Sequence, residues 1–180
     1  PAVDRLKERE RQAKDSVLRA VYNTVLAYVY EHNSQLDEDN HKQVAHDLYA
    51  KALEHPGLLA VARTDDYKSV MSRGSDSKIF EHDMLSVIGY EAQRFDILRE
   101  YYTKSGNRRA ALLASLQWLM QQRPEEMQPL EHSEYLQRVD SLLEEYGDLA
   151  EAGEGKIGKK RVLIDCANGA ASTTASSVFP

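Results

Sequence analysis

His82 and Asp83 are adjacent in the sequence, and their side chains are the first that could do chemistry together. His46 supplies a second imidazole upstream, and Asp140 supplies a distant carboxylate. Imidazole and carboxylate ligands suit a divalent metal ion that activates a bound water molecule. These residue types are therefore compatible with a hydrolytic metal centre.

The same four residues resemble the metal ligands of helical HD-type phosphohydrolases, which use a His-Asp pair, an upstream His and a distant Asp. A structural interpretation competes with this one. An acidic residue at 83 in the first turn of a helix would complement the helix dipole, and a neighbour would satisfy the imidazole. Because the chain has six His and 29 Asp and Glu residues, such pairs arise readily by chance. We favour the structural interpretation, and we predict no catalytic residue, no metal and no cofactor.

The candidate nucleophiles lack the partners that would activate them. Ser86, Ser105, Ser133 and Ser141 have no G-x-S-x-G context. Cys166 follows a predicted strand, and no His or Asn is recognisably placed to activate it, so we expect a buried apolar role. As the single cysteine, it excludes an intramolecular disulfide and a Cys-rich metal site.

Ten tyrosines are spread along the predicted helices. Tyrosine combines an apolar ring with a polar tip, so it serves both helix packing and protein recognition. Packing is the simpler interpretation of the set. If some aromatic residues form an interaction surface instead, the candidates are Tyr67, Tyr101, Tyr102 and Trp118.

The composition limits the class of protein. There are 23 Lys and Arg against 29 Asp and Glu, a net charge of -6, which disfavours nucleic-acid binding because that needs a concentrated basic face. No apolar run reaches the roughly 20 residues of a membrane span. Residue 1 is Pro rather than Met, so we expect the natural start to be missing, and targeting signals cannot indicate the compartment.

Apolar residues that recur at spacings of three and four predict helices over most of the chain. They cover residues 4–32, 40–55, 80–94, 95–103, 109–122 and 132–146. Pro56 and Gly57 end the second of these helices, and a short apolar turn follows. Residues 64–77 are rich in Asp, Ser and Gly and predict a long loop, and loops of that length are often functional. The chain is expected to be all-α, with residues 1–152 as a helical scaffold domain.

One helical hairpin resembles a tetratricopeptide-type unit. The aromatic pair Tyr101-Tyr102 precedes a turn at Gly106, and the small residues Ala110 and Ala111 follow. In that repeat an aromatic pair packs over a small-residue helix across a glycine turn. No second copy occurs at a fixed period. We therefore expect an irregular stack of antiparallel helical hairpins, tetratricopeptide-like only in part.

The composition changes after residue 152. Residues 153–160 are expected to form a linker, and residues 161–166 are the one convincing strand. A glycine turn and a helix start follow, so residues 161–180 are expected to be an incomplete βα unit. A lone strand lacks the partners that a stable sheet needs.

Residues 18–154 resemble the N-terminal helical region of bacterial α-macroglobulin-family proteins of the Bacteroides type. The likeness is carried, in order, by Leu18-Arg19-Ala20-Val21-Tyr22, Thr64-Asp65-Asp66-Tyr67, Ile79-Phe80-Glu81-His82-Asp83 and Tyr135-Leu136-Gln137-Arg138-Val139. The protease-trapping chemistry of that family lies in later domains, and no Cys-Gly-x-x-Glu-Gln thioester motif occurs in this chain. The resemblance implies a non-catalytic scaffold or interaction module in the periplasm or cell envelope. Its partners would be other domains of the parent protein or a separate protein.

Residues 159–180 resemble a different family. Val162-Leu163-Ile164-Asp165-Cys166-Ala167-Asn168-Gly169 looks like the strand and turn that open the second domain of α-phosphohexomutases, phosphoglucosamine mutase among them. This resemblance implies a fragment of a sugar-phosphate isomerase as an alternative function. The phosphoserine loop of that family comes earlier and its metal loop later, so the resemblance assigns no catalytic residue to this chain.

Overall fold

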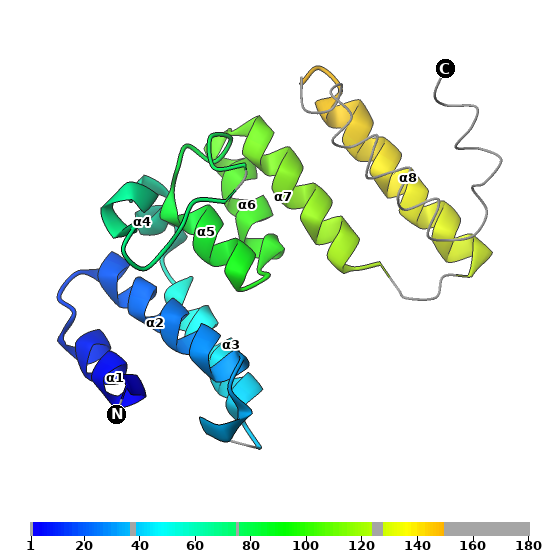
Figure 1. The fold of residues 1–180 in the computed structure, drawn as a ribbon. Coiled ribbons are helices and arrows are strands. Elements are labelled where there is room, and N and C mark those ends of the chain that lie inside the picture. Colours follow the sequence, from blue (N-terminus) through cyan, green and yellow to red (C-terminus); the bar gives the residue numbers. More distant parts are fainter. Residues whose placement is uncertain (1, 37–38, 75, 124–127, 150–180) are drawn as a thin grey trace. The chain divides into compact units, whose positions relative to one another are not determined.

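The structure is a computed structural model that describes residues 2–36, 39–74, 76–123 and 128–149. Every regular element in these ranges is a helix, which confirms the all-α prediction. The helices are α1 Ala2–Gln12, α2 Ser16–Glu31, α3 His41–Ala52, α4 Pro56–Val61, α5 Met84–Glu91, α6 Phe95–Ser105, α7 Arg108–Gln121 and α8 Pro129–Tyr146, with 3-10 turns η1 Ser34–Leu36 and η2 Thr64–Tyr67 (Figure 1). Within the described part, none of the helices combines the length and apolarity of a membrane span. The predicted linker 153–160 and βα unit 161–180 lie outside the described residues.

The chain divides into two compact units, Pro1–Tyr101 and Tyr102–Pro180, and each is described by itself. We call them unit 1 and unit 2. The boundary falls inside α6 rather than at a linker. Unit 1 contains α1 to α5 and most of α6, and unit 2 contains the end of α6 together with α7 and α8.

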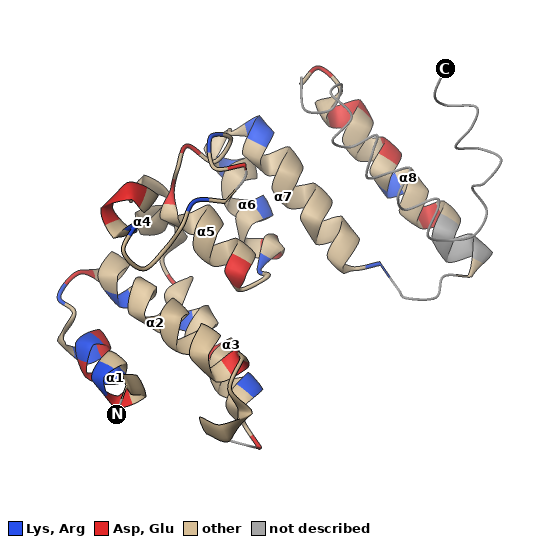
Figure 2. Ribbon diagram, viewed as in Figure 1, with Lys and Arg blue, Asp and Glu red and all other residues tan. Residues whose placement is uncertain are grey.

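The prediction of one helix over residues 4–32 is wrong, because the chain breaks between α1 and α2. Asp15 is the N-cap of α2, and its carboxylate accepts hydrogen bonds from Val17 N at 3.0 Å and Leu18 N at 3.3 Å. An aspartate that satisfies these amide groups favours a new helix start over continuation. The helix α1 is charged on most sides, as Figure 2 shows, and has no buried residue.

One core cluster of unit 1 lies between α2 and α3, which run side by side (Figure 1). Ala27 and Tyr30 of α2 pack with Ala45 and Tyr49 of α3 in one buried cluster. The two alanines let the helix axes approach closely, and the two tyrosines fill the remaining space. The helix predicted at 40–55 is thus confirmed as α3, with Asn40 as its N-cap.

The segment between α3 and α5 is more ordered than the sequence indicated. Pro56 does not only end α3, because it is also the first residue of α4, a position that suits its fixed φ and missing N–H. The predicted loop 64–77 begins with η2 and a turn at 68–70, and residues 71–74 follow without regular structure. The helix expected from residue 80 begins at Met84, because the residues before it form a turn and Asp83 caps α5.

Helix α6 confirms the helix predicted at 95–103, and α7 confirms that at 109–122. Gly106 joins them with a φ of +78°, a conformation that glycine adopts without a steric penalty. Asn107 then caps α7 by accepting a hydrogen bond from Ala110 N at 3.1 Å. The tetratricopeptide-like packing of this hairpin stays a prediction.

The core of unit 2 forms where α7 meets α8. Leu119 of α7 packs with Tyr135 and Val139 of α8, and Trp118 lies partly buried against this cluster. Beyond Arg108 and Arg109, α7 carries no charged residue, and the rest of the helix is tan in Figure 2. Helix α8 begins at Pro129, three residues before the predicted start at 132.

Candidate functional site: a groove between helices α2 and α5

Asp83 is the N-cap of α5 and so lies just before the helical turn in which we expected it. It is 3% exposed, and its Oδ1 accepts a hydrogen bond from Ser86 N at 2.9 Å as the N-cap of α5. Its backbone also pairs with Arg63 in an isolated antiparallel bridge. Capping satisfies amide groups that would otherwise lack partners at the helix start.

His82 closes the turn that precedes this cap. Its Nδ1 is hydrogen-bonded to Ser77 Oγ at 2.7 Å, and its backbone N–H donates to Ser77 O at 2.8 Å. Its carbonyl oxygen accepts from Thr64 N at 2.9 Å and from Thr64 Oγ1 at 2.8 Å. Both Glu81 and His82 have left-handed φ angles, 56° and 58°. These bonds hold two strained residues in place.

The four residues of the metal hypothesis come from three separate parts of the chain. His46 lies exposed on α3, with its Nδ1 3.4 Å from Asp47 Oδ1, and Asp140 belongs to α8 in unit 2. In the part of the chain that the structure describes, no group of three or more His, Cys, Asp or Glu side chains is placed to hold a metal ion.

The four aromatic interaction candidates have different surroundings. Tyr67 is half-buried and its hydroxyl donates to Asp15 Oδ2 at 3.3 Å; burial and this carboxylate raise the pKa of Tyr67. Tyr101 and Trp118 are also half-buried. Tyr102 is 3% exposed and belongs to the core, so its prediction as a surface residue is wrong. An aromatic ring on the inward side of a helix is used for packing.

Unit 1 contains a groove among its described residues. It consists of two adjoining pockets, of about 290 Å³ and about 280 Å³. Both are lined by Ser72, Val87 and Glu91, so they meet along the exposed side of α5. We call this site the α2–α5 groove, because α2 borders one pocket, α5 borders both, and residues 70–74 together with 76 and 77 complete the walls.

The pocket beside α2 is mainly apolar, and we call it the apolar pocket. Val25 and Tyr28 of α2 line it together with Val70, Met71 and Val87. Tyr28 is 49% exposed and Val70 is 54% exposed, so two large apolar side chains border the opening. Tyr28 also stacks on His32, with ring centroids 4.2 Å apart.

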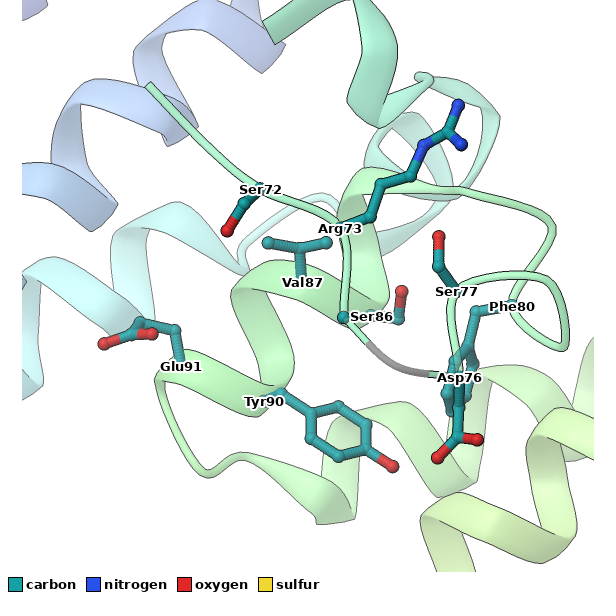
Figure 3. Close-up of a pocket in the computed structure, with 10 residues that line it drawn as sticks. Ser72, Arg73, Asp76, Ser77, Phe80, Ser86, Val87, Tyr90 and Glu91 are labelled. Carbon is teal, nitrogen blue, oxygen red and sulfur yellow. The ribbon is translucent and has the colours of Figure 1, made fainter. Parts of the chain in front are cut away.

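The other pocket carries most of the polar groups, and we call it the polar pocket. Ser72, Ser77 and Ser86 contribute hydroxyls, and Asp76 contributes a carboxylate near the phenol of Tyr90 (Figure 3). The Tyr90 ring meets Phe80 edge-on, with centroids 5.7 Å apart. Burial, with a further contribution from Asp76, raises the pKa of Tyr90 to about 12.

Three contacts position the segment that forms the outer wall of the groove. Arg73 is ion-paired with Asp65 in η2, and its side chain extends away from Asp76 and Tyr90 in Figure 3. Tyr67 binds the α2 cap residue Asp15, and Met71 N donates to Tyr67 O at 3.0 Å. The wall is thereby attached to the start of α2.

The sequence pointed to this segment but not to the groove. The length and composition of residues 64–77 suggested a functional loop, and Val70 and Met71 stand out as its apolar residues. That signal could have marked them as a binding surface. Nothing in the sequence indicated that α2 borders the groove, because α2 and residues 70–72 are far apart in the chain.

Comparison with protein families, curated proteins and solved structures gave no match to this chain. The groove and its chemistry therefore carry the functional argument.

Proposed function

We propose that the chain is a non-catalytic helical interaction module that binds a segment of a partner protein in the α2–α5 groove. The observation that carries this proposal is the groove itself, in which exposed Tyr28 and Val70 border two adjoining pockets. Exposed apolar side chains around a concave site are typical of protein recognition.

The arrangement of the two pockets suits side chains of a partner segment. Each pocket lies at the lower limit of the about 300–1,000 Å³ of ordinary small-molecule sites, and the two adjoin. A chain segment can use both pockets at once, because successive side chains can enter adjoining cavities. The shared wall at Val87 and Glu91 would then lie beneath the backbone of the bound segment.

The residues with catalytic potential support a non-catalytic role. The carboxylate of Asp83 caps α5, and His82 is held in the preceding turn by hydrogen bonds with Ser77 and Thr64. A general base needs access to a substrate proton within hydrogen-bonding reach. Both side chains are instead part of the framework that starts α5 and so forms one wall of the groove.

The parent protein that we propose is a bacterial α-macroglobulin-type protein of the cell envelope. The ordered sequence resemblance over residues 18–154 supports this part of the proposal. The partner would be another domain of that protein or a separate envelope protein. If the gene encodes no macroglobulin domains beside this module, the parent assignment fails and the groove proposal stands alone.

The groove is tested by selecting ligands from a random peptide display library on the whole chain. We expect peptides that bind the unchanged protein and are lost with Val70→Glu, because that change puts a carboxylate at the mouth of the apolar pocket. Val61→Glu is the matched control, since Val61 is 76% exposed on α4 and lines neither pocket of the groove. Selection of no peptide, or equal loss with both variants, would contradict the proposal.

A further inference from the structure

We propose that the apolar pocket of the α2–α5 groove binds a partner segment in which a basic residue accompanies an aliphatic one, and that the basic residue pairs with Glu31 and Glu91. The aliphatic side chain enters between α2 and residues 70–72, and the lysine or arginine lies at the ends of α2 and α5. This inference rests on the proposed function and names the chemistry of its partner.

Helices α2 and α5 both end on a glutamate. Glu31 is the last residue of α2 and Glu91 is the last residue of α5, and neither helix has a lysine or arginine in its last turn. The C-terminus of a helix carries a partial negative charge, so a carboxylate there is unfavourable and a cation is favourable. A basic group supplied by a ligand would therefore compensate both helix ends.

The two carboxylates act on the same residue, Tyr49 of α3. Glu31 accepts a hydrogen bond from the Tyr49 hydroxyl at 3.1 Å. Burial raises the pKa of Tyr49, and the charges of Glu31 and Glu91 add to the increase. Ala92, which follows Glu91, packs against the core cluster that contains Tyr49. Two like charges brought this close repel each other, and both attract a cation that approaches them.

The Glu91 carboxylate is open to a ligand. The residue is exposed, and its side chain makes no hydrogen bond or ion pair with another described residue. Arg94 follows shortly in the chain but donates from Nε and Nη2 to Asp96 at 2.9 and 2.7 Å, so its charge is already paired. In Figure 3 the Glu91 side chain extends away from Asp76 and Tyr90. The negative charge at this end of α5 therefore remains available.

The apolar pocket lies beside this carboxylate, because Glu91 is part of its lining. Val25 of α2, Val87 of α5 and Val70 supply its apolar surface, and its volume of about 290 Å³ accommodates a leucine, isoleucine or methionine side chain. The ring of Tyr28, 49% exposed, can contact the methylene groups of a neighbouring lysine or arginine. An apolar pocket with an acidic edge complements a segment that is both aliphatic and basic.

The test uses the sequences of the peptides selected on the unchanged protein, in which a lysine or arginine should recur at a fixed spacing from an aliphatic residue. A synthetic peptide of that sequence should bind about two- to fivefold more weakly to Glu91→Gln, and about tenfold or more weakly to Glu91→Lys. Replacing the basic residue of the peptide by glutamate should restore binding to Glu91→Lys, because the two charges are then exchanged. Glu54→Lys is the matched control, since Glu54 is exposed and lines neither pocket, and it should leave binding unchanged.

A second measurement separates recognition from folding. A lysine at the end of α5 complements the helix dipole, so the melting temperature of Glu91→Lys should equal that of the unchanged protein or exceed it by up to about 4 °C. Weaker binding by a protein that is at least as stable would assign Glu91 to the partner. A lower melting temperature would show that Glu91 supports the fold, and would overturn the inference.

Several binding results would also overturn it. Selected peptides without a recurrent basic residue, equal affinity for Glu91→Lys and the unchanged protein, or no rescue by the charge-exchanged peptide would each exclude pairing with Glu91. Self-association in sedimentation that Glu91→Lys abolishes would assign the site to a second copy of the chain. If peptides lack a basic residue but still require Val70, the interaction function survives and only this inference fails.

Discussion

Arg108 and Asp148 join the start of α7 to the turn after α8 through two parallel hydrogen bonds. Arg108 Nη1 donates to Asp148 Oδ2 at 2.5 Å, and Nη2 donates to Oδ1 at 2.8 Å. The Arg108 Nη2 also donates to Glu145 O at 2.8 Å, and the guanidinium lies 5.5 Å from the Tyr146 ring centroid. This cluster holds the end of α8 against α7 in unit 2, although both charged side chains are exposed.

The Arg108–Asp148 pair should have a small, salt-dependent effect on stability. We expect Asp148→Asn to lower the melting temperature by at most about 3 °C, because exposed ion pairs contribute little. The hydrogen bonds from Arg108 lower the pKa of Asp148 in the folded protein. The contribution is therefore present above the pKa of the unfolded chain and is lost as the pH falls through the folded value. Thermal melts at neutral pH, at acidic pH and in high salt measure this, and a larger loss in high salt would contradict it.

Gly89 should not tolerate even one added methyl group. An ideal Cβ at this position would lie 2.5 Å from Leu98 Cδ2, and Leu98 is fully buried. We expect Gly89→Ala to destabilise the protein by about 1–3 kcal/mol, the usual cost of overpacking a core. Gly57→Ala is the matched control in α4, since nothing lies within 4 Å of its added Cβ. It should be neutral or stabilising by up to about 1 kcal/mol, and urea unfolding compares the two.

Asp83→Ala should destabilise the protein because it removes the N-cap of α5. The loss is expected to be about 1–2 kcal/mol in urea unfolding. Asp83→Asn should retain most of the stability, since an amide oxygen can accept the hydrogen bond from Ser86 N. Equal losses for both variants would show that the charge, rather than the cap, is what matters at this position.

Tyr90 should ionise late in an alkaline titration followed by ultraviolet absorbance. Its pKa is raised to about 12 from the ordinary 10.0 of a tyrosine, first by burial and then by Asp76. Removing Tyr90 with Tyr90→Phe should delete the transition near pH 12, and Asp76→Asn should move it to lower pH. The raised folded pKa means that its stabilising contribution holds below the unfolded pKa and is lost as the pH rises through the folded one. An unchanged titration curve in Tyr90→Phe would contradict this assignment.

Local sequence patterns predicted most of the helices but not where they are interrupted. The turn at Gly106 and the cap at Asn107 are signals within a few residues, so the ends of α6 and α7 were predicted closely. The break before α2 was missed because the apolar spacing continues through it. Asp15 ends that continuity by capping α2, and its side chain is further engaged by Tyr67 from a distant part of the chain.

The α2–α5 groove and the roles of His82 and Asp83 were harder to predict from the sequence than the helices were. His82 and Asp83 drew attention as adjacent reactive side chains, but their roles depend on Ser77 and Thr64, which the fold brings to them. The α2–α5 groove depends on Tyr28 and Val70, which are 42 residues apart by their numbers in the sequence. No periodicity relates such positions, so only the folded chain places them together.

The left-handed pair Glu81 and His82 makes this turn a recognisable signature for distant relatives. Non-glycine residues with positive φ are uncommon, and β-branched residues are nearly excluded there. Gly, Asn or Asp at either position would relieve the strain, whereas Val, Ile or Thr would increase it. Proteins that share this turn should keep a residue with a hydroxyl group at position 64 and a capping Asp, Asn or Ser at position 83. A search for that spacing should find homologues after overall identity has faded.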